Sequence, residues 1–121
     1  MAANIEEWVG FDLDGTLATY DRWRGDDHIG KPVELMVRRL LHYIEKGYRC
    51  KIFTARVAPL EGRDTARVTR IIQDWCEAHI GHRLEVTCIK DQGLLQHFDD
   101  RCIQVVKNTG KIVINQRNKR K

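Results

Sequence analysis

The stretch that most constrains the fold is residues 8–17, which reads W-V-G-F-D-L-D-G-T-L. Its apolar start is typical of a buried strand, and a Gly-Thr turn directly after Asp14 ends that strand. The sequence therefore places two carboxylates, Asp12 and Asp14, at the carboxyl end of a strand, where open α/β sheets bind their ligands. Residues two apart point to the same side of a strand, so the two acids are expected to be neighbours. Such a pair requires a cation or a strong pKa shift, and Mg²⁺ suits oxygen ligands. A solvated Asp-Gly turn is the alternative.

The rest of the chain alternates between helical and strand patterns. Apolar residues recur at helical spacing in two longer segments, and Gly47 and Gly81 are typical stops for them. Helices are predicted at residues 32–47 and 64–79, strands at 48–54, 84–89 and 96–98, a short helical turn at 92–95, and a terminal hairpin at 102–106 and 112–114. The first arm of that hairpin could instead be helical. Strands that alternate with helices imply a parallel sheet with right-handed crossovers.

Length and composition indicate a single cytoplasmic domain. A chain of 121 residues with 42% hydrophobic content supports one modest core, assigned to residues 1–115, followed by a basic tail at residues 116–121. No apolar run approaches the roughly 20 residues that span a bilayer, and the first residues do not resemble a signal peptide. The cysteines have no C-x-x-C spacing and are expected to be reduced, mostly buried thiols; they are Cys50, Cys76, Cys88 and Cys102.

Four short motifs follow the predicted strands in order. They are D-x-D-G-T at residues 12–16, Thr54 in K-I-F-T-A-R, Lys90 in V-T-C-I-K, and the acidic pair Asp99 and Asp100 in H-F-D-D. Together they resemble the motifs of the haloacid dehalogenase-like (HAD) phosphohydrolases. The resemblance implies an α/β fold, namely a Rossmann-like three-layer sandwich with a parallel central sheet. About 40 residues separate Asp14 from Thr54, and about 35 separate Thr54 from Lys90. Each gap is filled by a helix and its loops, so no cap domain is expected.

The resemblance also implies a mechanism. Asp12 would be the nucleophile that forms an aspartyl-phosphate, and Asp14 would act first as general acid and then as general base. Thr54 would bind a phosphate oxygen, and Lys90 would neutralise Asp12 and the phosphate together. An Asp at position 14 is what the phosphatases and phosphomutases of this superfamily share.

The same resemblance implies a Mg²⁺ site. The metal would be bound by the carboxylates of Asp12 and Asp99 and by the backbone carbonyl of Asp14. Asp100 would act through water or would hold Lys90, and the sequence does not decide which of the two neighbouring acids touches the metal.

Substrate-binding groups are predicted on two loops. Arg56 follows the second strand and could hold a phosphate bidentately, as could Arg22 and Arg24 in the loop at residues 18–31. In the same loop, Tyr20 or Trp23 could stack on a base, or both could pack on the domain.

Two further groups of potential metal ligands are weaker. Asp26, Asp27 and His28 are more typical of a solvated turn than of a second metal site. Cys76, His79 and His82 offer only three zinc ligands across a helix end, so zinc is disfavoured.

The expected function is a Mg²⁺-dependent phosphatase that acts on phosphate monoesters. T-A-R after the second strand and F-D-D-R at the fourth motif are similar to the phosphatase domains that remove 3′-phosphates from polynucleotides, so nucleic-acid 3′-ends or nucleotides are the leading substrates. The expected partners are therefore a phosphorylated substrate, with nucleic acid among the candidates, and no membrane. Two alternatives stay open: a small-metabolite phosphatase whose lid is a neighbouring subunit, and a non-catalytic nucleic-acid-binding protein on the same fold.

Overall fold

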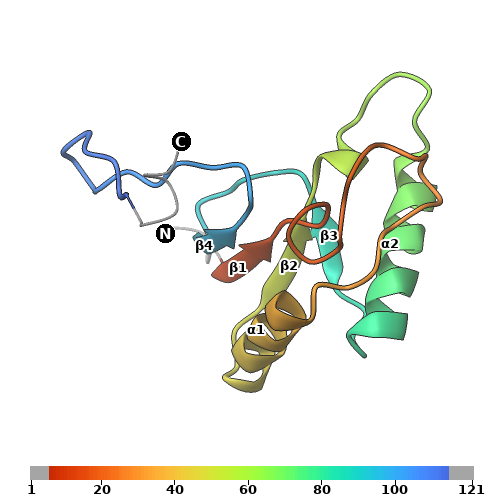
Figure 1. Ribbon diagram of the computed structural model, residues 1–121, viewed down its shortest axis with the longest axis horizontal. Coiled ribbons are helices and arrows are strands. Elements are labelled where there is room, and N and C mark those ends of the chain that lie inside the picture. Colours follow the sequence, from red (N-terminus) through yellow and green to blue (C-terminus); the bar gives the residue numbers. More distant parts are fainter. Residues whose placement is uncertain (1–5, 115–121) are drawn as a thin grey trace, which may run out of the picture.

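The computed structural model describes residues 6–114, which form a four-stranded parallel sheet, two α-helices and one short 3₁₀ helix (Figure 1). The strands are β1 (Trp8–Phe11), β2 (Cys50–Phe53), β3 (Glu85–Thr87) and β4 (Leu94–Phe98); the helices are α1 (Glu34–Glu45), α2 (Thr65–His79) and the short 3₁₀ helix η1 (Ala55–Val57). The strand order is β3-β2-β1-β4, and each neighbouring pair is parallel. The predicted α/β class with a parallel sheet is confirmed.

The element boundaries follow local signals where those signals are strong. The Asp64 side chain accepts a hydrogen bond from the Arg67 amide and so caps α2 as predicted. The predicted helical turn at residues 92–95 is wrong, because Leu94 already pairs with Trp8 and begins β4. Strand pairing is a contact across the sheet, and it overrides a weak local preference over so few residues.

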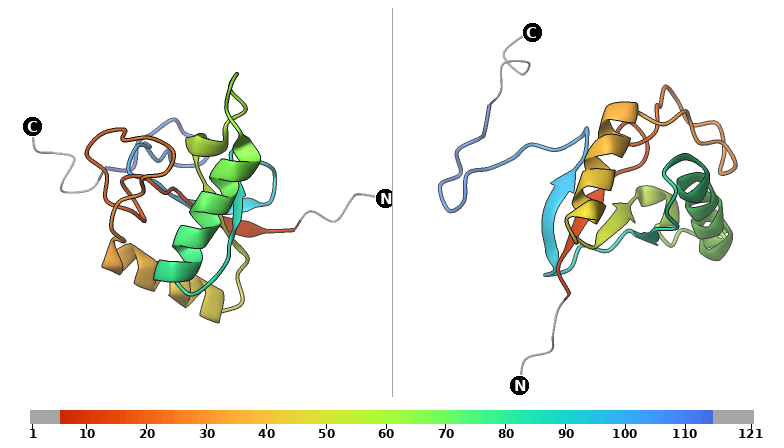
Figure 2. Two further views of the ribbon diagram at one scale, coloured as in Figure 1. Left: turned by 90° about the vertical axis from the view of Figure 1, so that its right-hand side faces the viewer. Right: turned by 90° about the horizontal axis from the view of Figure 1, so that it is seen from below.

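The main core lies on one face of the sheet, which both helices cover (Figure 2). Alternate residues of β1 and β2 point to this face, and the helices contribute their apolar stripes. The core includes Val9, Phe11, Cys50 and Ile52 from the sheet, Val37 and Leu40 from α1, and Val68, Ile72, Trp75 and Cys76 from α2. Right-handed crossovers from β1 to β2 and from β2 to β3 move in the same direction along the sheet, so both helices lie on the same side.

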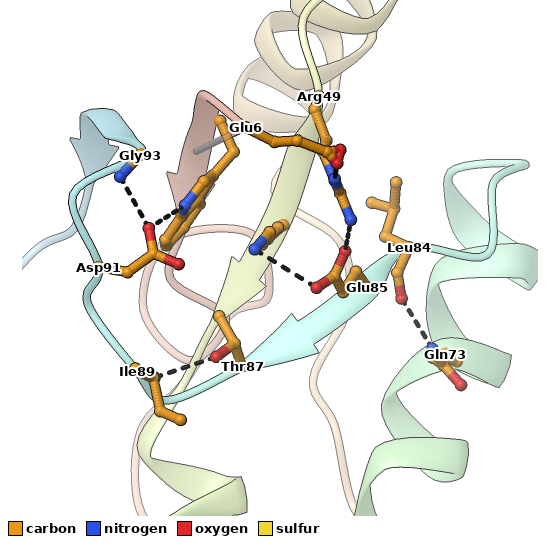
Figure 3. Close-up of polar contacts among 11 residues, drawn as sticks. Glu6, Arg49, Gln73, Leu84, Glu85, Thr87, Ile89, Asp91 and Gly93 are labelled. Carbon is orange, nitrogen blue, oxygen red and sulfur yellow. Dashed lines mark hydrogen bonds and ion pairs between the residues drawn. The ribbon is translucent and has the colours of Figure 1, made fainter. Parts of the chain in front are cut away.

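The opposite face of the sheet has no helix among residues 6–114, so the described chain has two layers where three were predicted. The loop between β3 and β4 crosses this face, and Asp91 Oδ1 accepts hydrogen bonds from Trp8 Nε1 and from the Gly93 amide, both at 2.8 Å (Figure 3). Lys51 Nζ lies 4.5 Å from the centre of the Trp8 ring and 3.3 Å from Glu85. Trp8 also packs edge-on against Phe53, and it is completely buried without a third layer.

The chain after β4 leaves the sheet and ends in a short hairpin that projects from it (Figure 1). Val105 and Ile112 form an antiparallel bridge, and the Val106 amide donates to the Lys111 carbonyl at 2.7 Å, so the predicted hairpin is confirmed. Its large aliphatic side chains are all exposed: Ile103, Val105, Val106, Ile112, Val113 and Ile114. The predicted basic tail at residues 116–121 lies outside the described residues. None of the helices in the described part is long and apolar enough to cross a membrane.

Candidate active site

The candidate site lies where β1, β2 and β4 end. Asp12 follows β1, Thr54 follows β2, and Asp99 and Asp100 follow β4. The carboxyl ends of parallel strands share one edge of the sheet, and β4 pairs directly with β1, so the two acidic motifs become neighbours. The sequence predicted this edge; the direct pairing of β1 with β4 is what brings the acids into contact.

Three carboxylates gather at this edge. Asp12, Asp99 and Asp100 each offer an oxygen, and these oxygens all lie within 4.8 Å of one another. Burial, the negative charge of Asp99 and a hydrogen bond with Asp100 together raise the pKa of Asp12 from 3.8 to about 7. Hard divalent ions such as Mg²⁺ bind clustered carboxylate oxygens, and a bound cation would relieve the repulsion that raises this pKa. The donor set therefore fits the predicted metal.

The turn after β1, formed by Gly15 and Thr16 of the first motif, ties the acids together. The buried Thr16 hydroxyl lies 3.4 Å from Asp12 Oδ2 and 3.3 Å from Asp100 Oδ1, and it accepts a hydrogen bond from the Asp100 amide at 3.1 Å. Gly15 has a φ of +88°, and a Cβ at this position would lie 2.6 Å from Asp100 Oδ2. The turn thus needs glycine for its backbone conformation and for the close approach of Asp100.

Asp99 is oriented by contacts at both of its oxygens. Its Oδ2 lies 2.9 Å from His97 Nε2, and its Oδ1 accepts the Arg101 amide at 2.7 Å. His97 Nδ1 is buried without a hydrogen-bond partner among the described residues, so the neutral ring with its proton on Nε2, donated to Asp99, satisfies the site best. The imidazole thereby holds Asp99 in the cluster.

Arg56 holds the second acid of the first motif. Its Nε and Nη2 donate to the two oxygens of Asp14 at 2.7 and 2.9 Å, and this guanidinium is almost fully buried. It also donates to the carbonyls of His28 at 2.8 Å and Asp26 at 3.3 Å. The Asp14 carboxylate is therefore held by Arg56 and is not a member of the three-acid cluster. The phosphate contact predicted for Arg56 and the metal contact predicted for the Asp14 carbonyl stay predictions.

Thr54 is buried at the end of β2 and faces the same space. Its hydroxyl oxygen accepts a hydrogen bond from the Arg56 amide at 3.1 Å, which leaves the O–H free to donate to a bound oxygen. This is the arrangement that phosphate binding by Thr54 requires.

A cleft of about 870 Å³ opens beside these groups. One side is formed by the loop after β1, which contributes the half-exposed rings of Tyr20 and Trp23, and another by the chain after β2, including Pro59 and Arg63. Arg101, which follows the acidic pair, also lines it. No role was predicted for Arg63 or Arg101, although Arg101 stands in F-D-D-R at the fourth motif.

Three predicted site residues are not brought to the cleft. Lys90 lies on the β3–β4 loop and lines a separate shallow depression with Asp91, Gln92 and Leu94. Arg24 is paired with Asp21 at 2.5 Å, and Arg22 is a largely exposed neighbour of the same carboxylate at 3.6 Å. Lys90, Arg22 and Arg24 therefore do not belong to the lining of the cleft beside the acids.

The weaker metal candidates do not form sites in the described part of the chain, where the three-acid cluster is the one group of potential ligands that comes together. Asp27 pairs with Arg67 on α2. Burial raises the pKa of the Cys76 thiol to about 12, which opposes its use as a thiolate ligand.

No known family model matches the chain, and no curated protein is significantly similar to it.

Proposed function

We propose that this protein is a divalent-metal-dependent phosphatase that hydrolyses phosphate monoesters through an aspartyl-phosphate, as the HAD phosphohydrolases that its motifs resemble do. The observation that carries the proposal is the meeting of Asp12, Asp99 and Asp100 within 4.8 Å at the carboxyl edge of a parallel sheet. Asp14 and Thr54 line the same cleft. A solvated turn explains none of this convergence, because the residues come from three separate strand ends.

The chemistry divides between the two acids of the first motif. A carboxylate oxygen of Asp12 attacks phosphorus, the bond from phosphorus to the leaving oxygen breaks, and Asp14 gives its proton to that oxygen. Water then loses a proton to Asp14 and attacks the same phosphorus, which releases phosphate and restores the Asp12 carboxylate. Mg²⁺ held by Asp12, Asp99 and Asp100 would offset the negative charge of the phosphoryl group.

Arg56 positions the Asp14 carboxylate for these reaction steps. Its two hydrogen bonds hold the Asp14 carboxylate as an acceptor, the form that deprotonates water. For the first step Asp14 must hold a proton and exchange at least one of these bonds for the leaving oxygen. Lys90 has no part in the proposal; Arg63 and Arg101 are the cations that line the cleft beside Arg56.

Phosphate release from a substrate panel tests the proposal. The panel pairs oligonucleotides phosphorylated at the 3′ or 5′ end with mononucleotides and sugar phosphates, each with Mg²⁺ and with a chelator. Asp12→Asn and Asp14→Asn should each lower metal-dependent release by more than about 10³-fold. Asp74→Asn, which alters an exposed carboxylate on α2 paired with Arg83, is the matched control and should release phosphate at the wild-type rate. Turnover by Asp12→Asn near the wild-type rate would sink the mechanism.

The same panel separates the alternative functions. A cleft of about 870 Å³ has room for a mononucleotide or a small organic phosphate, whether free or at the end of a polymer. Release from sugar phosphates alone would support the small-metabolite phosphatase. Tight nucleic-acid binding without release from any substrate would support the non-catalytic alternative.

A further inference from the structure

One aromatic side chain in the cleft is placed as a stacking surface. The Trp23 ring lies with the Arg56 guanidinium carbon 4.8 Å from its centre, and half of the Trp23 surface is exposed at the cleft. Arg56 packs against the indole, and the exposed half of Trp23 is available to a ligand in the cleft. The attraction between the guanidinium and the π system of the ring helps to hold the indole in place at the cleft.

This surface is held rigidly with respect to the acid Asp14. The guanidinium that backs Trp23 is the one bound to both oxygens of Asp14, and it also binds the carbonyls of Asp26 and His28 in the loop that contains Trp23. The base of the loop is closed by the Thr19 amide, which donates to the Lys31 carbonyl at 2.8 Å. A surface that is already ordered loses little entropy when a ligand binds.

The loop is also fixed from the side of α2. Trp75 Nε1 donates to the Gly30 carbonyl at 3.1 Å, and Arg67 pairs with Asp27. Tyr20, a second half-exposed ring on the same loop, lines the cleft as well, and Pro59 lines it from the chain after β2. The cleft therefore combines an acidic, phosphate-directed end with a rigid aromatic wall next to the acid that serves the leaving group.

We infer that the substrate is a phosphate monoester whose leaving alcohol carries a flat aromatic ring, a nucleoside, and that Trp23 stacks on its base. This inference rests on the proposed phosphatase function, since it names the leaving group that the same site would take. Stacking on one aromatic side chain typically contributes about tenfold or more to the binding of a base, with little dependence on which base it is. Trp23 is thus a specificity-determining residue, and its partner Arg56 is a positioning residue.

The kinetic test uses substrates that differ only in the base. Adenosine 3′-monophosphate is compared with ribose 3-phosphate, and adenosine 5′-monophosphate with ribose 5-phosphate, so that each pair has the same leaving hydroxyl. For at least one pair, kcat/KM should be about tenfold higher for the nucleotide, chiefly through KM. Trp23→Ala should remove most of that preference and Trp23→Phe should keep most of it. Tyr48→Ala, a half-exposed aromatic outside the cleft, is the matched control and should leave the ratio unchanged.

A binding test needs no turnover. Of the three tryptophans, Trp8 and Trp75 are 0% and 8% exposed whereas Trp23 is 50% exposed, so stacking at Trp23 should dominate any quenching. Adenosine should quench the tryptophan fluorescence of the wild type saturably, ribose should not, and Trp23→Phe should lose the quenching.

The outcomes separate the two proposals. Asp12-dependent phosphate release with equal kcat/KM for nucleotide and ribose phosphate in both pairs would overturn the stacking inference and keep the phosphatase. A preference that survives in Trp23→Ala would overturn it as well. Saturable quenching by adenosine that depends on Trp23, with no release from any substrate, would support the base-stacking surface and discard the phosphatase.

Discussion

Replacing Asp12 by Asn should raise the thermal stability of the metal-free protein at pH 8. Asp12 lies among Asp99 and Asp100, and its burial together with the charge of Asp99 raises its pKa to about 7. At pH 8 the carboxylate is therefore ionised in a place that disfavours its charge. An uncharged amide of nearly the same size removes that cost.

The magnitude follows from the pKa. An increase from 3.8 to about 7 corresponds to at most about 4 kcal/mol, at 1.36 kcal/mol for each pKa unit. Asp12 is only partly buried, so solvent screening reduces the cost to about 1–2 kcal/mol. For a domain of this size, that difference raises the melting temperature by about 5 °C.

The sign depends on pH. Between pH 3.8 and about 7 the folded protein retains a proton that the unfolded chain releases, so the wild type loses stability as the pH rises through this window. Below it both states are protonated, and Asp12→Asn should gain nothing. The gain should grow from pH 4 to pH 7 and stay constant above.

Thermal unfolding of the wild type, Asp12→Asn and the control Asp74→Asn at pH 4, 6 and 8 measures this, in the presence of a chelator and then of Mg²⁺. Added Mg²⁺ should stabilise the wild type at pH 8, by about 2.7 kcal/mol at one hundred times its dissociation constant, and should stabilise Asp12→Asn much less. A melting temperature of metal-free Asp12→Asn at pH 8 that lies below that of the wild type would refute the reasoning, because it would mean that the Asp12 carboxylate makes favourable contacts that outweigh the crowding.

Three further substitutions test other parts of the structure. Arg56→Ala should destabilise the protein by about 3 kcal/mol in denaturant unfolding, because it leaves the partly buried Asp14 without its partner; a loss below about 0.5 kcal/mol would contradict the ion pair. Gly15→Ala should abolish the Mg²⁺-induced rise in melting temperature, since its Cβ would displace Asp100, and a wild-type rise would argue against Asp100 as a ligand. Lys90→Ala should release phosphate near the wild-type rate, whereas Arg101→Ala should raise KM several-fold. A loss of activity in Lys90→Ala with an unchanged KM in Arg101→Ala would mean that the β3–β4 loop turns toward the acids when substrate binds.

Local patterns were sufficient for much of the fold. The helices at α1 and α2 follow from apolar residues at helical spacing, and the Asp64 cap follows from a side chain that can accept an amide hydrogen bond. The extent of β4 and the missing third layer did not follow, because both depend on what a strand pairs with and on what covers a face. A loop that places Asp91 under Trp8 leaves no signature in the spacing of apolar residues.

The sequence by itself determined which acids stand at the ends of strands: Asp12 after β1 and the pair Asp99 and Asp100 after β4. It also determined that a glycine follows Asp14, where the backbone requires a positive φ. These features are local, since a strand, its end and the turn after it are encoded within a few consecutive residues.

Only the tertiary structure decided which of these groups meet. Parallel pairing of β1 with β4 joins the three acids, while Arg56 turns back to hold Asp14 and to support Trp23. Lys90, which follows a strand as its motif requires, lies in a separate depression. The physical reason is that strand order and the direction of a long side chain depend on packing between distant segments, which the spacing of motifs along the chain does not encode.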